Sequence, residues 1–421
     1  MRDDDSRSKS GTVISIQGAY CAFGPRERQR ASVEIIDGHI TRIAKNHDTT
    51  LGEAAGAIDL TGYLLMPGFI NAHDHLQFAL HPRIADPPYQ NYVEWGEDIH
   101  SKFSDVITLH RSVPKAVRLW WGGLRNLLCG VTTVCHHDKL WPELERAEFP
   151  VKVVRRYGWG HSVALGGDLH QARALTPMGS VFIVHACEGV DDQTRAELFQ
   201  LDQLGLLTSD TVLVHGLAVD EPGIALMQER GVSLILCPSS NEYLFGSLPS
   251  ANMLIGIDDV ALGNDSPLTA VGDLLDEVRF ALQSLRLTPD ETYHMVTKAP
   301  AAVLRLPVGS GAICKNAPGD IIAVRDTGHH AADRLQALSM DDIEFVMIDG
   351  RVQLSSQAVW KRLPAHIRDG LEPLYINGIL RWLRAPVEEL LRQAEDVLGC
   401  GRVRLSGRQI ELPITGQLAV R

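Results

Sequence analysis

The chain has 421 residues, of which 45% are hydrophobic and 22% are charged, and its formal net charge is −12. This length exceeds one ordinary domain, and the composition is that of a globular protein with a large core. The acidic balance argues against a nucleic-acid partner, because no basic stripe is available to neutralise phosphates. We therefore expect a small-molecule partner.

The amino-terminal segment is polar, and residues 1–10 are predicted to form a flexible tail. It lacks the apolar stretch of a signal peptide, and no later run approaches the length of a membrane span. The seven cysteines are widely spaced and include no C-x-x-C pair, which is typical of reduced thiols. We therefore expect a cytoplasmic protein with no membrane contact.

Residues 11–66 have the patterning of β-structure. An Asp37-Gly38 pair divides two strand-like runs, as in a hairpin. β character returns after residue 306, in the runs PGDIIAVRD and DIEFVMIDGRVQL. We therefore predict a small β-sandwich domain that combines residues 11–66 with residues 306–421.

The carboxyl-terminal part of this domain contains two amphipathic patterns, EPLYINGILRWLR and PVEELLRQAEDVL, and then a hairpin-like run, GRVRLSGRQIEL. The two patterns predict helices, each with one apolar face. We expect these faces to pack on the body of the protein or on a second subunit, which makes a homodimer an open alternative.

Residues 67–305 alternate between short apolar runs and helical patterns. The candidate strands end at or near seven positions: His73, His137, Tyr157, His185, His215, Cys237 and Asp265. Repeated strand–helix units with apolar strands predict an α/β fold, a TIM-like (β/α)8 barrel. Because only seven strands are visible, we expect a degenerate or missing fourth unit between Tyr157 and Val181.

The first barrel strand is followed by an H-x-H motif. Because side chains alternate along a strand, His73 and His75 can both face the barrel mouth, with Asp74 directed away. Two imidazoles suit zinc or a comparable divalent ion, and a carboxylate can complete the ligand set. An isolated H-x-H is more often structural, but here three further clusters follow.

These clusters are His185 with Glu188 in VFIVHACE, His215 in TVLVHG and Asp265 in DVALGNDS. Each follows an apolar run, and the carboxyl ends of barrel strands meet at one face of the barrel. The sequence therefore predicts a metal site at this face. The spacing of Glu188 from His185 suits proton transfer at that site, although a solvated loop carboxylate is the alternative.

The combination of motifs resembles the amidohydrolase superfamily, in particular the branch of cytosine deaminase, S-adenosylhomocysteine deaminase and the triazine hydrolases. The motifs that carry the resemblance span nearly the whole chain: PGFINAHDHL, GVTTV, HACE, VHG, CPSSN, ALGNDS and TKAPAAVLRL. The resemblance implies a metal-dependent hydrolase that holds a divalent ion, with zinc expected and iron as the alternative. Lys152 stands at the wrong end of its strand for a carbamylated bridge, which favours a single ion.

Carried over residue by residue, the resemblance makes four residues the metal ligands: His73, His75, His185 and Asp265. It further implies that Glu188 shuttles a proton and that His215 contacts the attacking water or the developing oxyanion. Asp265 is expected to orient the attacking water as well as to bind the ion.

Six further residues are candidates for substrate contacts: His136, His137, Trp159, His161, Asn241 and Glu242. Strand alternation allows only one of the two adjacent histidines to face the site. Trp159 and His161 are assigned to the end of the third strand, and a turn role is equally open for Asn241 and Glu242. His81 is expected at the surface.

The predicted function is hydrolysis of a non-peptide C–N bond, by deamination or by ring or amidine hydrolysis of a small cyclic or heterocyclic substrate. Displacement of chloride or another leaving group at the same centre is an alternative. A non-catalytic scaffold on the same fold is an alternative of a different class. The sequence has neither the G-x-S-x-G motif of a serine hydrolase nor the P-C-x-x-C motif of cytidine-deaminase-type enzymes.

Overall fold

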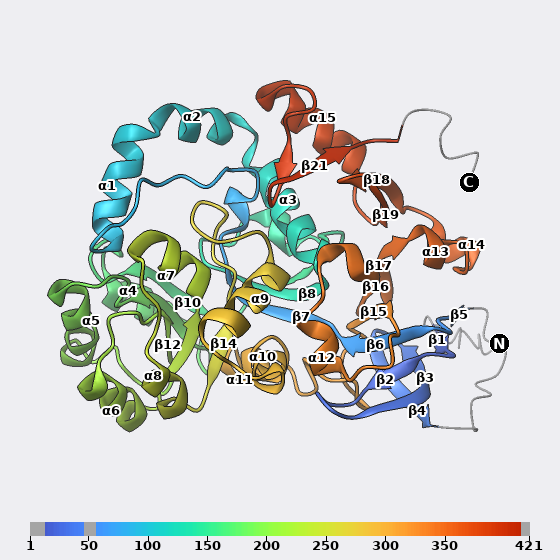
Figure 1. The fold of residues 1–421 in the computed structure, drawn as a ribbon, viewed down its shortest axis with the longest axis horizontal. Helices are drawn as coiled ribbons and strands as arrows, with labels where there is room; N and C mark the ends of the chain where they lie inside the picture. Colours follow the sequence, from blue (N-terminus) through green and yellow to red (C-terminus); the bar gives the residue numbers. More distant parts are fainter. Residues whose placement is uncertain (1–12, 46–55, 414–421) are drawn as a thin grey trace, which may run out of the picture.

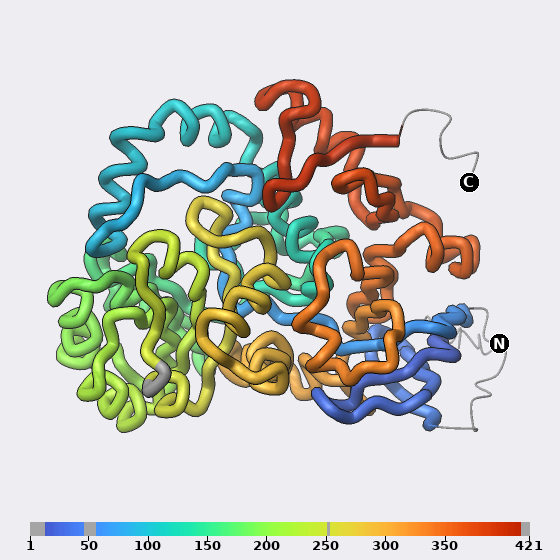
Figure 2. Tube along the Cα trace, viewed as in Figure 1, coloured from blue at the N-terminus to red at the C-terminus, as the bar shows by residue number. Residues whose placement is uncertain are grey.

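The computed structural model describes residues 13–45 and 56–413, and Figures 1 and 2 show their arrangement. The tail expected at residues 1–10 lies outside the described residues. Within them, no helix is both long enough and apolar enough to cross a membrane. Five of the seven cysteines are buried, Cys314 and Cys400 are exposed, and all seven are free thiols.

Eight short parallel strands form the centre of the larger part of the molecule, which confirms the α/β class. They are β7 (Phe69–Asp74), β8 (Val131–His136), β9 (Lys152–Val153), β10 (Gly158–Ser162), β11 (Phe182–Ala186), β12 (Thr211–His215), β13 (Ser233–Leu236) and β14 (Val260–Leu262). Hydrogen bonds order them as β7–β8–β9 and as β10–β11–β12–β13–β14. A parallel bridge between Asp74 and Asp265 joins β7 to β14.

The irregular unit lies elsewhere than the sequence predicted. Only residues 154–157 separate β9 from β10, and these four described residues contain no helix. In contrast, α4 (Leu169–Ala174) lies inside the stretch in which a unit was expected to be missing. All eight strands are therefore present, and the helix after the third strand is absent. The sequence concealed β9 because this strand has only two residues, and Trp159 and His161 consequently lie on the fourth strand.

α-Helices follow the strands other than β8 and β9 and cover their outer side (Figure 1), and only a short 3-10 helix, Pro142–Glu145, lies between β8 and β9. These α-helices are α3 (Lys115–Leu128), α4, α5 (Asp192–Gln203), α6 (Glu221–Arg230), α7 (Pro238–Phe245), α8 (Ala251–Gly256), α9 (Leu274–Ser284), α10 (Pro289–Met295) and α11 (Lys298–Val303). Aspartates at the N-caps fix where several of these helices begin. Asp191, Asp220 and Asp273 each accept a hydrogen bond from the first turn, which satisfies a backbone donor that has no partner in the helix.

Two further helices, α1 (Tyr92–Lys102) and α2 (Ser104–Ser112), lie between β7 and α3, and we call them the roof helices. They form the arch at the top left of Figure 1. The first of them starts within the run NYVEWGEDIH, at residues 91–100. The Asn91 side chain accepts hydrogen bonds from the backbone of Val93 and Glu94, so Asn91 is an N-cap and starts α1.

Strands from both ends of the chain form one thirteen-stranded hydrogen-bonded path. They are β1 (Val13–Gln17), β2 (Tyr20–Ala22), β3 (Arg28–Ile36), β4 (His39–Lys45), β5 (Ala57–Asp59), β6 (Tyr63–Pro67), β15 (Ile321–Arg325), β16 (Ile343–Ile348), β17 (Arg351–Ser356), β18 (Glu372–Ile376), β19 (Ile379–Leu383), β20 (Arg404–Leu405) and β21 (Arg408–Glu411). The two chain ends meet where β6 pairs antiparallel with β15. The predicted hairpin at Asp37-Gly38 is present between β3 and β4.

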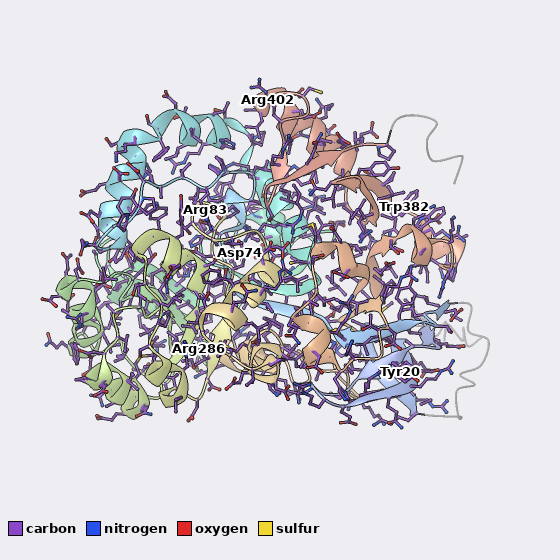
Figure 3. All side chains as sticks on the ribbon, in the orientation of Figure 1. Tyr20, Asp74, Arg83, Arg286, Trp382 and Arg402 are labelled. Carbon is purple, nitrogen blue, oxygen red and sulfur yellow. The ribbon has the colours of Figure 1, made fainter. Side chains whose placement is uncertain are left out.

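The first of the two predicted carboxyl-terminal helices is a hairpin instead. EPLYINGILRWLR folds into β18 and β19, because Asn377 and Gly378 both adopt positive φ angles and make the tight turn. The Trp382 side chain, labelled in Figure 3, stacks on Trp360 at 4.4 Å between ring centres. This part also contains three short helices, α12 (Ala331–Leu335), α13 (Gln357–Trp360) and α14 (Ala365–Arg368).

The second predicted helix is α15 (Val387–Leu398), and the hairpin after it is β20–β21. Its apolar side is buried, and α15 contacts both α2 and α3. The carboxyl-terminal segment therefore supports one of the roof helices. This packing agrees with the expectation that α15 packs on the body of the protein.

An ion-pair cluster joins β9 to the residues beside β15 and β16 of the thirteen-stranded sheet. The Lys152 ammonium lies 2.5 Å from a carboxylate oxygen of Asp320 and 3.0 Å from one of Asp349. Asp320 is nearly buried, so its charge depends on this partner. The lysine that sequence reasoning excluded as a metal bridge therefore has a structural partner at the opposite end of the strand.

Replacing Lys152 with methionine should lower the free energy of unfolding by about 1–3 kcal/mol, because Asp320 loses its main counter-charge. Urea unfolding measures this change, and Lys139→Met, at an exposed lysine, is the matched control. The metal content of the purified protein should stay unchanged. Loss of metal in Lys152→Met would contradict the purely structural role.

Candidate active site

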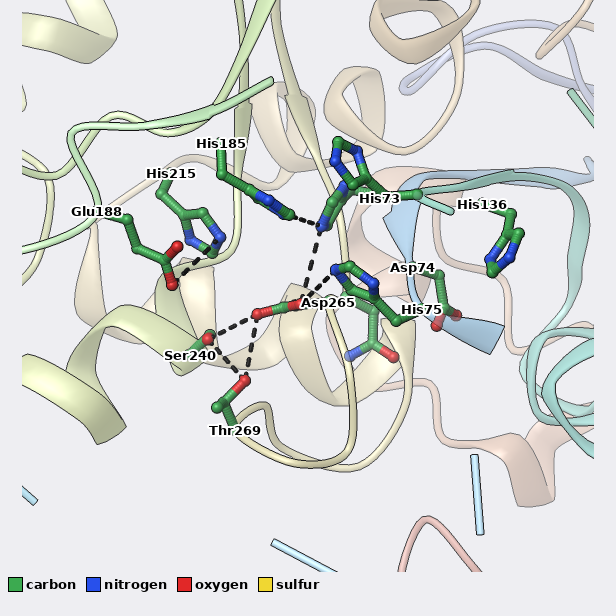
Figure 4. Close-up of polar contacts among 12 residues, drawn as sticks. His73, Asp74, His75, His136, His185, Glu188, His215, Ser240, Asp265 and Thr269 are labelled. Atoms are coloured by element: carbon green, nitrogen blue, oxygen red, sulfur yellow. Dashed lines mark hydrogen bonds and ion pairs between the residues drawn. The ribbon is translucent and has the colours of Figure 1, made fainter. Parts of the chain in front are cut away.

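Three imidazoles converge at the carboxyl ends of β7 and β11. His73 and His75 end β7, His185 ends β11, and one nitrogen of each ring lies within 4.8 Å of the others. The Nε2 atoms of His73 and His185 are 3.0 Å apart. Figure 4 shows these rings turned toward a common point. The strand alternation predicted for the H-x-H motif thus brings both of its imidazoles into one cluster.

Asp265, just beyond β14, faces the cluster with one carboxylate oxygen. Its Oδ1 lies 3.8 Å from Nε2 of His73 and 3.6 Å from Nε2 of His75. Its Oδ2 accepts hydrogen bonds from the hydroxyls of Ser240, at 2.8 Å, and Thr269, at 3.2 Å (Figure 4). The two hydroxyls therefore orient the carboxylate and leave Oδ1 free to face the histidines.

Hydrogen bonds to the second ring nitrogens fix the tautomers of two histidines. His185 Nδ1 lies 2.5 Å from the carbonyl oxygen of His161, and His215 Nδ1 lies 3.0 Å from the amide oxygen of Asn241. A carbonyl oxygen accepts only, so Nδ1 carries the proton in both rings. The Nε2 lone pairs of His185 and His215 are consequently free for a metal ion or a substrate atom.

The histidines of the cluster are held neutral. Burial lowers the pKa of His73 and His185 well below the ordinary value, and neighbouring imidazoles lower both further. Burial also lowers the pKa of His75 to about 4, against the opposing effect of Asp265. A neutral imidazole is the form that binds a metal ion. The cluster is therefore ready to bind an ion without first losing protons.

Glu188 lies opposite the cluster, with its Oε1 3.6 Å from Nε2 of His215. Burial, together with the charges of Asp265 and Glu197, raises the pKa of Glu188 well above its ordinary value. A carboxyl group with a raised pKa can hold a proton near neutral pH and release it again, as a general acid–base requires. The carboxyl group that the HACE motif singled out therefore has the environment of a proton carrier.

The backbone at the strand ends is unusual at two of these residues. His215 has a φ of 74° and Asp265 a φ of 53°, in the left-handed region that few non-glycine residues adopt. Such conformations persist where the surrounding structure holds them and are found at functional sites. They turn the His215 and Asp265 side chains away from the direction that a continuing strand would give.

Asp74 points away from the cluster, as the alternation predicts, and is fully buried (Figure 4). Its Oδ2 accepts hydrogen bonds from Arg125 at 3.1 Å and Asn126 at 2.7 Å. The same Arg125 nitrogen donates to the carbonyl oxygen of Asp265 at 3.0 Å and to the side chain of Asn264. Arg125 therefore connects the end of β7 to the residues after β14, directly behind the histidines.

The structure distinguishes the two adjacent histidines after β8. His137 lines the cavity at the cluster, and its ring centre lies 4.2 Å from that of His185. His137 Nε2 is 3.1 Å from the carbonyl oxygen of Gly160, whereas its Nδ1 is buried without a partner. The His136 ring lies on the far side of His75, beside Asp74 (Figure 4). His137 is thus the one that faces the site.

The other four candidates for substrate contacts also differ in whether they line the cavity. Trp159 and His161 line the cavity. Asn241 is buried and reaches the site through His215, whereas Glu242 is exposed and does not line the cavity. Both residues lie within α7, so the turn role left open for Asn241 and Glu242 is wrong, and Glu242 makes no contact with the cavity.

The cluster lies at one end of a cavity of about 340 Å³. The sequence did not indicate six of the residues that line this cavity. They are Gln77, Phe78 and His81 after β7, and Tyr92, Trp95 and Ile99 of α1. Recognition of Asn91 as an N-cap would have given the α1 residues. The expectation of a surface position for His81 was wrong, since this ring is buried beneath the roof helices.

Comparison with known proteins gives matches over most of the chain. The model of the amidohydrolase family matches residues 179–353. A 5-methylthioadenosine/S-adenosylhomocysteine deaminase of Haloarcula marismortui is 30% identical over 371 residues, which cover 72% of this chain and 84% of that protein.

Two solved structures share the fold. A zinc-bound adenosine deaminase from Xanthomonas campestris is 19% identical and has a TM-score of 0.64, with 91% of this chain and 97% of that chain covered. The atrazine chlorohydrolase of Arthrobacter aurescens TC1, complexed with zinc, is 16% identical and has a TM-score of 0.68, with 91% and 99% covered. The chain thus spans nearly the full length of both.

Replacing Asn241 with leucine should lower turnover by about 10- to 100-fold, because His215 loses the acceptor that fixes its tautomer and orientation. Metal content, measured by elemental analysis, should not change. Asn241→Asp keeps an oxygen acceptor at the same position and should retain more activity than Asn241→Leu. Equal activity in Asn241→Leu and the wild type would show that His215 needs no such support.

Glu277 of α9 anchors the start of α7, which carries Ser240 and Asn241. Its Oε1 accepts a hydrogen bond from the backbone N–H of Ser239 at 2.8 Å, and its Oε2 contacts the Ser239 hydroxyl. Burial raises the pKa of Glu277 to about 8. The folded protein therefore holds a proton here that the unfolded chain has released above its ordinary pKa of 4.5.

This raised pKa predicts that the stability of the wild type, relative to Glu277→Gln, falls as the pH rises from about 5 to about 8. The folded state binds more protons than the unfolded state in this range, and glutamine does not titrate. Melting temperatures across the range measure the effect, with Glu148→Gln, at an exposed residue, as the control. A difference that does not vary with pH would be inconsistent with a protonated Glu277.

Proposed function

The chain belongs to the amidohydrolase superfamily, in the branch that holds S-adenosylhomocysteine deaminases and triazine hydrolases, and it is a metal-dependent hydrolase. From this premise we propose that it releases ammonia from an aminated heterocycle, with His73, His75, His185 and Asp265 as the ligands of one zinc ion. The observation that carries the proposal is the convergence of three neutral imidazoles, Asp265 and the Glu188–His215 pair at one end of a closed-in cavity.

The donor atoms suit this ion. Three imidazole nitrogens and one carboxylate oxygen form a ligand set that zinc prefers, and iron is the alternative. The protonated Nδ1 of His185 leaves Nε2 for the ion, and the two hydroxyls on Oδ2 of Asp265 leave Oδ1. A bound divalent ion lowers the pKa of water from about 15.7 to about 7, which supplies hydroxide near neutral pH.

The chain's own residues provide the remaining chemistry. Glu188 takes a proton from the attacking water and delivers it to the leaving nitrogen, for which its raised pKa is suited. His215, held by Asn241, faces the oxygen that becomes negative as the tetrahedral carbon forms, and in its protonated form it would stabilise that oxygen by about 3 kcal/mol. Asp265 also orients the attacking water with the oxygen that faces the histidines.

The cavity supports a small planar substrate. Its volume of about 340 Å³ is within the usual range for small-molecule sites, and Phe78, Trp95 and Trp159 give it aromatic walls. We assign direct substrate contacts to His137, Trp159 and His161. A purine nucleoside is the first substrate to test, because the deaminase relatives are named for such compounds.

A second candidate reaction is hydrolytic dechlorination. It is kept as a candidate because a zinc-complexed atrazine chlorohydrolase shares the fold, with a TM-score of 0.68. The same carbon of a heterocycle would be attacked, and chloride would leave in place of ammonia. Measurement of the released ion separates the two reactions.

We further propose that the eight strands form one (β/α)8 barrel within residues 67–305, in which the α-helices after β8 and β9 are missing. Residues 11–66 and 306–421 would then form the small domain, arranged as a β-sandwich. Support comes from the pairing of β6 with β15 and the bridge between β7 and β14. A homodimer and a cytoplasmic location remain predictions from the sequence.

The proposed mechanism predicts that Glu188→Gln lowers kcat by about 10²- to 10⁴-fold while metal stays bound, because the proton carrier is lost. The assay is ammonia release from the zinc-loaded protein over amino-purines, amino-pyrimidines and amino-triazines. His73→Ala should lose the metal. A folded wild type that binds no metal would favour the non-catalytic scaffold, and unchanged turnover in Glu188→Gln would reject the mechanism.

A further inference from the structure

The end of the cavity beneath the roof helices contains polar atoms without partners. His81 is 5% exposed, and both of its ring nitrogens lack a hydrogen bond. Gln77 is 7% exposed, and its Oε1 also lacks one. Both residues line the cavity. Buried polar atoms are rarely left unpaired, so these atoms indicate a place for a polar ligand. The N–H of the neutral His81 ring and the amide nitrogen of Gln77 are the groups that can donate to it.

The same end of the cavity carries positive charge that no carboxylate balances. Arg111, in the last turn of α2, lines the cavity. The buried Arg118 lies behind it and donates to the backbone carbonyl oxygens of Gln77 and Val113. Within the described residues, neither arginine forms an ion pair with an acidic side chain. An anion bound here would therefore meet two cations whose charges are available.

The electrostatics around His81 agree with this picture. Burial lowers the pKa of His81 to about 3, and His110, Arg118 and Arg111 lower it further. Two of these neighbours, Arg111 and Arg118, are permanent cations, so positive charge lies close to this imidazole. The His110 ring lies 5.0 Å from the His81 ring, so the imidazole also has a second basic neighbour in contact range.

The acidic side chains of the cavity lie elsewhere. Glu188 and Asp265 belong to the cluster at the opposite end. Asp138 lies 3.3 Å from the ammonium of Lys115, so its charge is balanced. The cavity therefore has two ends of different chemistry, one with metal-type ligands and carboxylates and one with unbalanced cations.

We propose that the roof end of the cavity, formed by Gln77, His81 and Arg111, binds an anionic group of the substrate, a carboxylate or a phosphate. This inference rests on the proposed function, because it places the reacting ring at the histidine cluster. Arg111 pairs with the anion at the cavity mouth, and His81 donates a hydrogen bond from one ring nitrogen. Arg118 holds the backbone of Gln77 and adds charge from behind.

The spacing fits a heterocycle with a short acidic arm. The Phe78 ring lies between the two ends, 6.1 Å from the ring of His75 and 5.2 Å from that of His81. The arm would cross Phe78, so that the aromatic ring covers its apolar part. A substrate without the anionic group would leave the two arginines unpaired and the His81 nitrogens without partners.

The test compares matched ligands that differ only in this group. Zinc-loaded Glu188→Gln is titrated calorimetrically with adenosine, adenosine 5′-carboxylate and adenosine 5′-phosphate, and then with amino-pyrimidine and amino-triazine pairs with and without a carboxylate arm. We expect an acidic member to bind at least about tenfold more tightly than its neutral partner. Arg111→Gln and His81→Phe in the same background should remove this preference, whereas Arg146→Gln, at an exposed arginine outside the cavity, should keep it.

The outcomes are distinguishable. Preference for a carboxylate or for a phosphate identifies the natural group, and either supports the proposal if Arg111→Gln abolishes it. No preference in any pair, or a preference that survives both Arg111→Gln and His81→Phe, overturns the proposal. Absence of ammonia release by the wild type from every compound would instead reject the proposed function, which the binding measurements do not depend on.

Discussion

The arrangement of the site depends on the ion pair and the hydrogen bonds that the buried guanidinium of Arg125 forms. Arg125 and Asp74 are each 1% exposed, and the same nitrogen reaches the backbone of Asp265 on the other side. A buried ion pair of this kind adds little net stability compared with apolar packing, but loss of one partner is costly. Its main effect is therefore positional. It holds the end of β7, which carries two histidines, against the residues after β14, which carry the carboxylate that faces them.

Further hydrogen bonds from helix residues surround this ion pair. Ser240 and Asn241, adjacent on α7, orient Asp265 and His215 respectively, and Glu277 holds the start of that helix through Ser239. Asp265 and His215 are therefore each fixed by a partner on α7, whereas His185 is held by the His161 carbonyl oxygen on β10. Since several groups must act on one small ring, this rigidity is what the chemistry requires.

The sequence predicted the residues at strand ends well, because alternation and the convergence of parallel strands are local and general rules. His73, His75, His185, Glu188, His215 and Asp265 were all found together. Prediction failed where local patterns were weak or ambiguous. The two-residue strand β9 has too few residues to show a period, and the β18–β19 hairpin has a spacing of apolar residues that also fits a helix.

The supporting residues could not have been predicted from the sequence, because their roles come from contacts between distant segments. Arg125 lies in α3 and belongs to none of the motifs, and the CPSSN motif contains Ser240 without indicating its contact with Asp265. His81 is buried only because the roof helices cover it. What identifies each of these residues is a contact with a residue more than twenty positions away in the sequence. Such contacts become visible only when the fold brings the segments together.

β9 and β10 are not paired by hydrogen bonds, and we call this gap between the two groups of parallel strands the seam. The residues beside the seam and those far from it differ in how freely they can be substituted. The proposed ligands and proton carriers follow β7, β11, β12 and β14, and none of them lies on the strands beside the seam. Insertions or deletions near residues 154–157 would thus first alter the wall formed by Trp159 and His161, and they would reach the reactive groups through the His161 carbonyl oxygen that holds His185. The missing helix after β9 marks a place where the choice of substrate can diverge over evolution while the reaction is retained.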